Sequence, residues 1–286
     1  MQVELLWGRW RRWRVRRLRP GYIERMAQLR RGDVEGAPHE ILDPRDLKYC
    51  RNQCTACWDK SDDPFAWRDR LPFARWGLAE LQLFGWPLLA LVVGLSWYWW
   101  PLGYLAAVPL VLIVWFFRDP PRSIPQEPGL IVSPADGKLT EITRLEHDPY
   151  LDGPAVRIGI FLSIFNVHIN RSPAEARVIE VRYSPGEFRN ALDPASAQVN
   201  EHTWIALEEE APPHRTMIVR QIAGTIARRI VCDLRPGEVI PRGHKFGMIK
   251  FGSRTELILP DSGNLHILAE VGDRVRAGAT ILARYE

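Results

Sequence analysis

The sequence of 286 residues predicts a mainly β domain of the sandwich or barrel type, preceded by an α-helical membrane hairpin. Residues 81–117 hold 37 consecutive uncharged residues, too many for one membrane crossing of roughly 20 helical residues. After Arg118 the sequence changes to short apolar runs separated by Gly, Pro, Asp and Asn, which is typical of strands joined by turns. The chain therefore divides into an N-terminal extension (1–75), a hairpin (76–117) and a β domain (118–286).

The extension is basic, with 17 Lys and Arg against 11 Asp and Glu, whereas the remaining 211 residues carry 21 against 23. Ten of the first 31 residues are Arg, interleaved with Trp7, Trp10 and Trp13. Such a segment favours an anionic surface, although a solvated basic tail fits equally well. Among anionic surfaces we expect a lipid bilayer and no nucleic acid. No apolar core or small-residue cleavage site follows the charges, so we expect no secretory signal.

Three of the four cysteines are clustered, at Cys50, Cys54 and Cys57, which argues against a disulfide framework and for a cytoplasmic redox environment. Their spacing matches iron–sulfur ligands of radical enzymes that use S-adenosylmethionine. Those enzymes carry a large α/β barrel after the motif, whereas here an apolar stretch begins some 24 residues later, so we reject that interpretation. A small zinc or iron–sulfur site completed by His39 or an Asp stays open, and we assign no metal ligand.

The uncharged run contains three prolines and predicts two helices, at 78–96 and 102–117. Positive charge flanks both ends of the run, which places both on the cytoplasmic side of the cell membrane. Four aromatic residues between the helices suit the opposite interface: Trp97, Tyr98, Trp99 and Trp100. The second helix is short enough to be re-entrant, and a buried hairpin in a soluble protein is the alternative.

The β domain contains ten candidate strands, and their short lengths and close spacing favour a sandwich or barrel over a parallel sheet. They lie at 130–133, 138–142, 155–164, 176–183, 203–207, 216–222, 225–232, 256–259, 265–269 and 281–285.

Three segments place a reactive or proton-handling side chain among small or turn-forming residues. Asp136 lies in the segment 133–137, which alone reads as a turn. His168 follows a strongly apolar strand, where a lone histidine is more often structural. The pair Gly252-Ser253 lies between an apolar run and the next strand.

Together these segments resemble the phosphatidylserine decarboxylase family, in the shorter form whose cleavage site reads Phe-Gly-Ser-Arg. The resemblance covers about residues 116–286 and includes the segments 116–120, 133–137, 167–171, 221–224, 227–229 and 247–254, while residues 1–75 show no match. The family's functional Asp, His and Ser fall on Asp136, His168 and Ser253. Lys250 is a mild departure, because related sequences often have Arg there.

The residue types fit a self-cleavage reaction. Ser253 Oγ can attack the carbonyl of Gly252, and glycine permits the strained backbone that brings the two together. A serine hydroxyl needs a base, so we expect His168 to take its proton while Asp136 orients the ring. β-Elimination then opens the ester, and position 253 becomes a pyruvoyl group with loss of ammonia. The pyruvoyl cofactor is thus derived from the chain itself.

The resemblance implies that the pyruvoyl group acts as an electron sink for decarboxylation of phosphatidylserine to phosphatidylethanolamine, with His168 returning a proton. It also implies a zymogen whose cleaved large and small chains form a heterodimer at the membrane. Candidate phosphate-binding residues, each as readily an ion-paired or solvated charge, are Arg171, Arg228, Arg229, Lys250 and Arg254. We assign none of them firmly.

Two other functions compete. The closing segment 271–283 resembles the turn of biotinyl or lipoyl carrier domains, which supports a non-catalytic, membrane-anchored adaptor or carrier, but the attachment turn around a lysine is missing. A pyridoxal-phosphate decarboxylase would need a parallel α/β sheet and a lysine setting that the sequence lacks.

Overall fold

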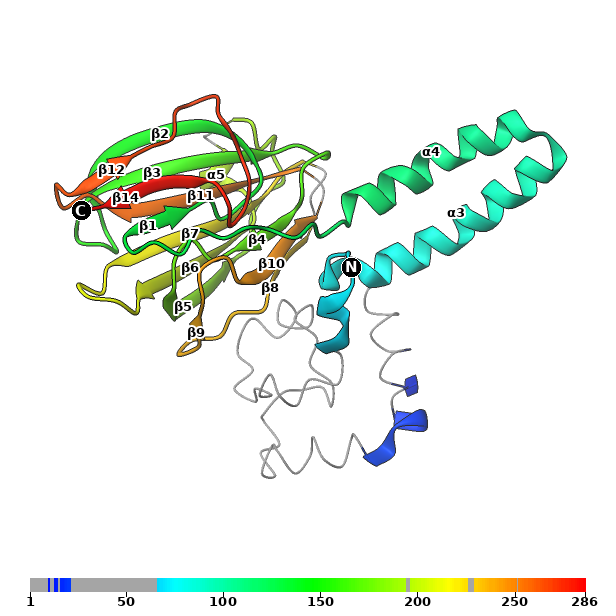
Figure 1. Ribbon diagram of the computed structural model, residues 1–286, viewed down its shortest axis with the longest axis horizontal. Helices are drawn as coiled ribbons and strands as arrows, with labels where there is room; N and C mark the ends of the chain where they lie inside the picture. The colour runs from blue at the N-terminus through cyan, green and yellow to red at the C-terminus, as the bar shows by residue number, and fades with distance from the viewer. Residues whose placement is uncertain are drawn as a thin grey trace. The chain divides into compact units, whose positions relative to one another are not determined.

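The computed structural model describes residues 10, 13, 14, 16–21, 66–193, 196–225, 229–250 and 252–286 (Figure 1). The chain forms two compact units, Met1–Trp67 and Arg68–Glu286. The cysteine cluster proposed as a metal site and the phosphate-binding candidate Arg228 lie outside the described residues. The second unit contains both the helical hairpin and the β domain.

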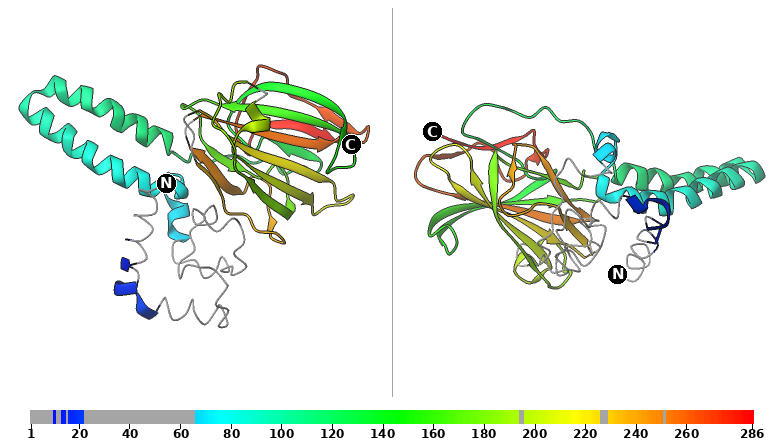
Figure 2. Two further views of the ribbon diagram at one scale, coloured as in Figure 1. Left: turned by 180° about the vertical axis from the view of Figure 1, so that it is seen from behind. Right: turned by 90° about the horizontal axis from the view of Figure 1, so that it is seen from below.

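Two 3-10 turns, Ala66–Arg70 and Arg75–Gly77, lead into helices α3 (Leu78–Tyr98) and α4 (Trp100–Phe116). The two helices run side by side in opposite directions, and both views in Figure 2 show this arrangement. Pro101 lies in the first turn of α4, where the missing N–H of proline removes no helical hydrogen bond. The two predicted helices are therefore present, α4 beginning two residues earlier than expected.

By length and composition, Arg75–Tyr98 is a candidate membrane span, whereas Trp100–Phe116 is shorter. Large apolar side chains are exposed along both helices, among them Trp86 in α3 and Leu105 in α4. Such an exposed apolar surface needs an apolar partner, which bears on the function proposed below.

The described residues of the β domain form fourteen strands, and every pairing between these strands is antiparallel. They are β1 (Leu130–Val132), β2 (Gly137–Asp148), β3 (Gly153–Leu162), β4 (Ile169–Arg171), β5 (Ala176–Ser184), β6 (His202–Glu209), β7 (Thr216–Ala223), β8 (Arg229–Cys232), β9 (Val239–Ile240), β10 (Lys245–Lys250), β11 (Ser253–Pro260), β12 (Leu265–Ile267), β13 (Arg274–Val275) and β14 (Ile281–Tyr285). A one-turn helix, α5 (Ser196–Val199), precedes β6.

The strands form one large sheet and two small ones. The large sheet has the order β13-β2-β3-β11-β7-β6-β5-β9 and curls, while the small sheets are β1-β14-β12 and β4-β10-β8 (Figure 1). A mainly β fold with helices at its N-terminal side is therefore confirmed.

Some strands escaped the sequence prediction. The short strands β4, β9, β10 and β13 were not expected, and β11 begins at Ser253 rather than at 256. For β11, the late predicted start follows from its composition. This strand is buried on both faces, although it contains Arg254 and Glu256. Charged residues in a fully buried strand remove the apolar pattern by which strands are recognised.

Two apolar clusters matter for the site. The main core lies on one face of the large sheet and includes Leu139, Ile160 and Leu257. A second cluster joins the ends of the hairpin to the β4-β10-β8 sheet, through residues such as Trp76, Phe116 and Met248. The hairpin and the β domain thus share a packed core.

Candidate active site

The pair Gly252-Ser253 lies where the chain crosses from one sheet to another. β10 ends at Lys250 in the small β4-β10-β8 sheet, and β11 begins at Ser253 in the large sheet. Gly252 has a φ of 65°, in the left-handed region that residues with a side chain rarely adopt. The corner between the sheets therefore requires the glycine that sequence analysis assigned to the scissile carbonyl.

Ser253 is fully buried, at 0% exposure. Its backbone lies opposite Leu162 of β3 and Ala223 of β7. Among the described residues, Oγ of Ser253 has no hydrogen-bond partner. A buried hydroxyl left without a partner costs about 1–3 kcal/mol, so a group of this kind in a stable fold points to a reactive role.

Gly224 packs against the carbonyl of Gly252. A Cβ atom built on Gly224 would lie 2.4 Å from the carbonyl oxygen of Gly252 and 3.1 Å from its carbon. Any side chain at 224 must therefore displace the carbonyl that Ser253 would attack. Sequence analysis included this glycine in a matching segment but did not select it, because only the fold shows what it contacts.

His168 lies against the same peptide. Its Nδ1 is 2.9 Å from the carbonyl oxygen of Asn166, which can only accept, so Nδ1 carries the proton. The Gly252 N–H then donates to the free Nε2 of His168, over 3.4 Å. The fold brings the predicted base within reach of the predicted cleavage site.

The imidazole is neutral under ordinary conditions. The pKa of His168 is lowered to about 4, chiefly by burial and also by the charge of Arg118, while the hydrogen bond to Asn166 acts in the opposite direction. A neutral ring with its Nε2 lone pair directed at the scissile segment is a competent proton acceptor.

Within the described part of the chain, Asp136 forms no hydrogen bond with His168, because both ring nitrogens have other partners and the backbone carbonyl of Asn166 orients the ring. Asp136 instead pairs with Arg122 over 2.7 Å and accepts a 2.8 Å hydrogen bond from the N–H of Ala277. Asp136 therefore joins the segment after the hairpin to the C-terminal part of the chain. A backbone partner leaves no signal in the sequence, so the ring's orientation could not be predicted.

The candidate phosphate-binding side chains are internal. Arg171 pairs with Asp119 over 3.1 Å, and Lys250 pairs with Glu80 in the first turn of α3. Arg229 and Arg254 are also buried. These positions favour the ion-paired alternative over an open phosphate site.

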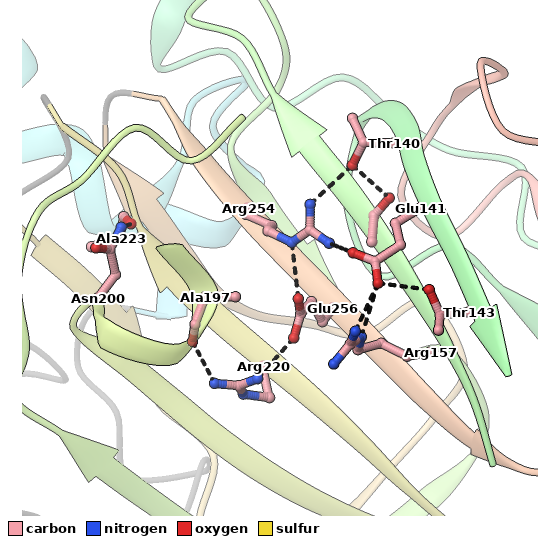
Figure 3. Close-up of polar contacts among 11 residues, drawn as sticks. Thr140, Glu141, Thr143, Arg157, Ala197, Asn200, Arg220, Ala223, Arg254 and Glu256 are labelled. Atoms are coloured by element: carbon pink, nitrogen blue, oxygen red, sulfur yellow. Dashed lines mark hydrogen bonds and ion pairs between the residues drawn. The ribbon is translucent and has the colours of Figure 1, made fainter. Parts of the chain in front are cut away.

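Arg254 is the centre of a buried charge network that sequence analysis missed (Figure 3). Its guanidinium contacts Glu256 over 2.9 Å and Glu141 over 2.5 Å. The two carboxylates are themselves paired, Glu141 with Arg157 over 2.7 Å and Glu256 with Arg220 over 2.8 Å. The residue after Ser253 is therefore fixed to β2, and through its partners to β3 and β7.

A buried serine at a glycine-bearing strand corner, with a neutral imidazole against the preceding peptide, is an arrangement that suits a self-processing proenzyme. Residues 110–283 match the family model for phosphatidylserine decarboxylase. The chain therefore belongs to the phosphatidylserine decarboxylase family.

Several curated relatives carry the name phosphatidylserine decarboxylase proenzyme. The protein of Rhodopirellula baltica is 50% identical over 240 residues, which cover 84% of this chain and 99% of that protein. Those of Symbiobacterium thermophilum and Carboxydothermus hydrogenoformans are 42% and 41% identical, each over 70% of this chain and 93% of the relative. Relatives named as proenzymes of a decarboxylase do not favour the carrier alternative.

Proposed function

We propose that this chain decarboxylates phosphatidylserine to phosphatidylethanolamine, after cutting itself between Gly252 and Ser253. The observation that carries the proposal is the joint placement of three groups: the buried, unpartnered Oγ of Ser253, the left-handed Gly252, and the Nε2 of a neutral His168. Family membership supplies the substrate class.

The self-cleavage uses only groups of the chain. Ser253 Oγ attacks the carbonyl carbon of Gly252 and gives its proton to His168 Nε2, and the C–N bond breaks to leave an ester and a free amine. Removal of the Ser253 Cα proton then expels Gly252 as a carboxylate. The resulting dehydroalanine takes up water and loses ammonia, which leaves a pyruvoyl group on residues 253–286.

The surroundings of Ser253 fit such a group. Ser253 begins a strand with neighbours on both sides, so its carbonyl end would be held in place after the cut. When formed, the pyruvoyl group supplies the electron sink that lets the lipid lose carbon dioxide. We assign to His168 the return of a proton to the lipid carbon.

The two products should remain together as a heterodimer. The segment 253–286 contains β11 to β14, and three of these strands pair with strands from residues 1–252: β11 with β3 and β7, β13 with β2, and β14 with β1. The hydrogen bond from Ala277 to Asp136 adds a further connection.

The hairpin is the proposed membrane anchor, with the catalytic domain on the cytoplasmic side of the cell membrane. The support is the candidate span Arg75–Tyr98 and the exposed apolar side chains along both helices. A diacyl lipid stays in the bilayer, so an anchored enzyme gains proximity to its headgroup.

Denaturing electrophoresis with mass spectrometry tests the cleavage. Wild-type protein should give a large chain and a 34-residue peptide, 253–286, that begins with a keto group, while Ser253→Ala should stay whole. Ser262→Ala is the matched control, because Ser262 lies on the same fragment and its hydroxyl bonds only locally, to Asn264 over 2.8 Å.

Borohydride added with phosphatidylserine should trap a lipid adduct on the small chain. A wild-type chain that decarboxylates the lipid while remaining whole would disprove the proposed chemistry.

A further inference from the structure

The ends of the hairpin form part of the self-cleavage site. The apolar cluster that joins them to the small sheet holds Phe116 at the end of α4 together with Val167 and Ile169, the two neighbours of His168. On the other side it holds Met248 of β10, the strand that leads to the scissile bond. One packed cluster therefore connects α4, the histidine and the cleaved segment.

Phe116 covers the imidazole directly. The ring centroids of Phe116 and His168 are 4.3 Å apart with 37° between their planes, and both side chains are buried. The nitrogens at the edge of the imidazole contact Asn166 and Gly252, while Phe116 lies over its face. The hairpin thus supplies part of the apolar shell that keeps the ring neutral.

The loop before His168 is also held by the hairpin. The Trp115 indole N–H donates to the carbonyl of Phe165 over 3.2 Å, and the Arg118 guanidinium donates to the same carbonyl over 2.9 Å. Asn166, whose carbonyl orients His168, closes this loop through its side chain, which accepts from the N–H of Ser163 over 2.9 Å. The position of the loop therefore depends on the end of α4.

The first turn of α3 contacts the other side of the site. Glu80 forms an ion pair with Lys250, and the side chain of Lys250 is only 6% exposed. Lys250 ends β10, two residues before Gly252. An ion pair at this depth is screened little by solvent, so it restrains the chain just ahead of the scissile peptide.

We propose that Phe116 and Glu80 are positioning residues for self-cleavage, so that the chain matures only when the hairpin is packed against the β domain. This inference rests on the proposed function and adds a second role to the hairpin besides attachment to lipid. Phe116 acts through His168, and Glu80 acts through Lys250.

The rate of cleavage of newly made full-length chain, produced by cell-free synthesis in the presence of detergent micelles, tests the inference. Phe116→Ala should slow cleavage on the order of 10- to 100-fold, because a displaced base loses its alignment. Leu105→Ala, a similar truncation at an exposed position in the same helix, should cleave at the wild-type rate.

The pH profile separates positioning from a general loss of structure. Cleavage requires neutral His168, so the wild-type rate should be constant above about pH 5 and fall near pH 4. In Phe116→Ala, water reaches the ring and raises its pKa towards about 6.5, so the rate at about pH 5.5 should drop relative to that at about pH 8. Arg118, the charged group that acts on the ring, is unchanged in this variant. Phe116→Leu keeps the ring dry and should retain the wild-type profile.

A separate experiment tests Glu80. It also tests the inference if Phe116→Ala does not fold. Glu80→Gln should slow cleavage, and the exchanged pair Glu80→Lys with Lys250→Glu should cleave faster than either single charge reversal. Wild-type rates and profiles in Phe116→Ala and Glu80→Gln would overturn the inference while leaving the proposed function intact. A wild-type chain that never cleaves would instead overturn the proposed function.

Discussion

The two strands that meet at the proposed cleavage bond are held in different ways. β10, before the bond, lies in a sheet of three strands that packs against the apolar cluster at the hairpin ends, and its last residue, Lys250, pairs with Glu80. β11, after the bond, lies between β3 and β7 in the sheet of eight strands and carries the buried charge network of Arg254. The connection between them is short and contains the left-handed Gly252.

The difference shows how a chain can lose one peptide bond and keep its structure. Each side of the bond has neighbouring strands of its own, β4 and β8 beside β10 and β3 and β7 beside β11, so the connecting peptide contributes little to the position of either strand. The stronger restraint belongs to β11, the strand that would carry the new terminus. Mutations on the two sides should therefore affect different quantities.

The largest expected effect is a loss of stability from the β11 side. Arg254→Met, made in the uncleavable Ser253→Ala background, removes the cation from between the buried carboxylate of Glu256 and the partly buried carboxylate of Glu141. Glu141 and Glu256 keep their other arginines, so we expect a loss of about 3 kcal/mol, near the lower end for a broken buried ion pair. Thermal unfolding in detergent should show a melting temperature lower by roughly 10 °C. An unchanged melting temperature would show that the network does not hold the strand.

The next effect concerns the bond itself. Gly224→Ala should slow self-cleavage on the order of 100-fold, because the added methyl group must displace the carbonyl of Gly252. The measurement is the intact fraction of newly synthesised chain over time. Gly153→Ala is the matched control, since the nearest atom to its added Cβ lies 4.0 Å away. Equal rates in the two variants would contradict the contact between Gly224 and the scissile carbonyl.

The smallest effect is expected from a substitution that lies away from the end of β10 and the start of β11. Arg144 pairs with Asp261 over 3.2 Å, and its side chain is 77% exposed. Arg144→Ala should change the free energy of unfolding by at most about 0.5 kcal/mol and leave the cleavage rate unaltered. A loss comparable to that of Arg254→Met would mean that burial does not distinguish the two ion pairs.

The parts of this molecule that depend on local sequence could be predicted. The uncharged run predicted both helices of the hairpin, and the apolar runs predicted most of the longer strands. Ser253 and His168 could be selected because the residues around them match motifs of the family. The fold brings the Gly252-Ser253 corner and His168 together.

The parts that depend on contacts between residues far apart in the sequence could not be predicted. Asp136 contacts Ala277, which lies 141 positions along the chain, and no local pattern reveals that partner. The orientation of His168 comes from a backbone carbonyl, which every residue possesses. The start of β11 was missed because Arg254 and Glu256 interrupt its apolar pattern, and their partners Glu141 and Arg220 lie on distant strands.

The central position of β11 has a consequence for the lifetime of the protein. On the proposed function, each molecule makes its reactive ketone once, from a serine that is consumed. Replacing a damaged small chain would require β11 to leave the middle of the sheet, which would expose the hydrogen-bonding edges of β3 and β7 together. Renewal of activity would then depend on translation of a complete new polypeptide, and turnover of the enzyme would match turnover of its cofactor.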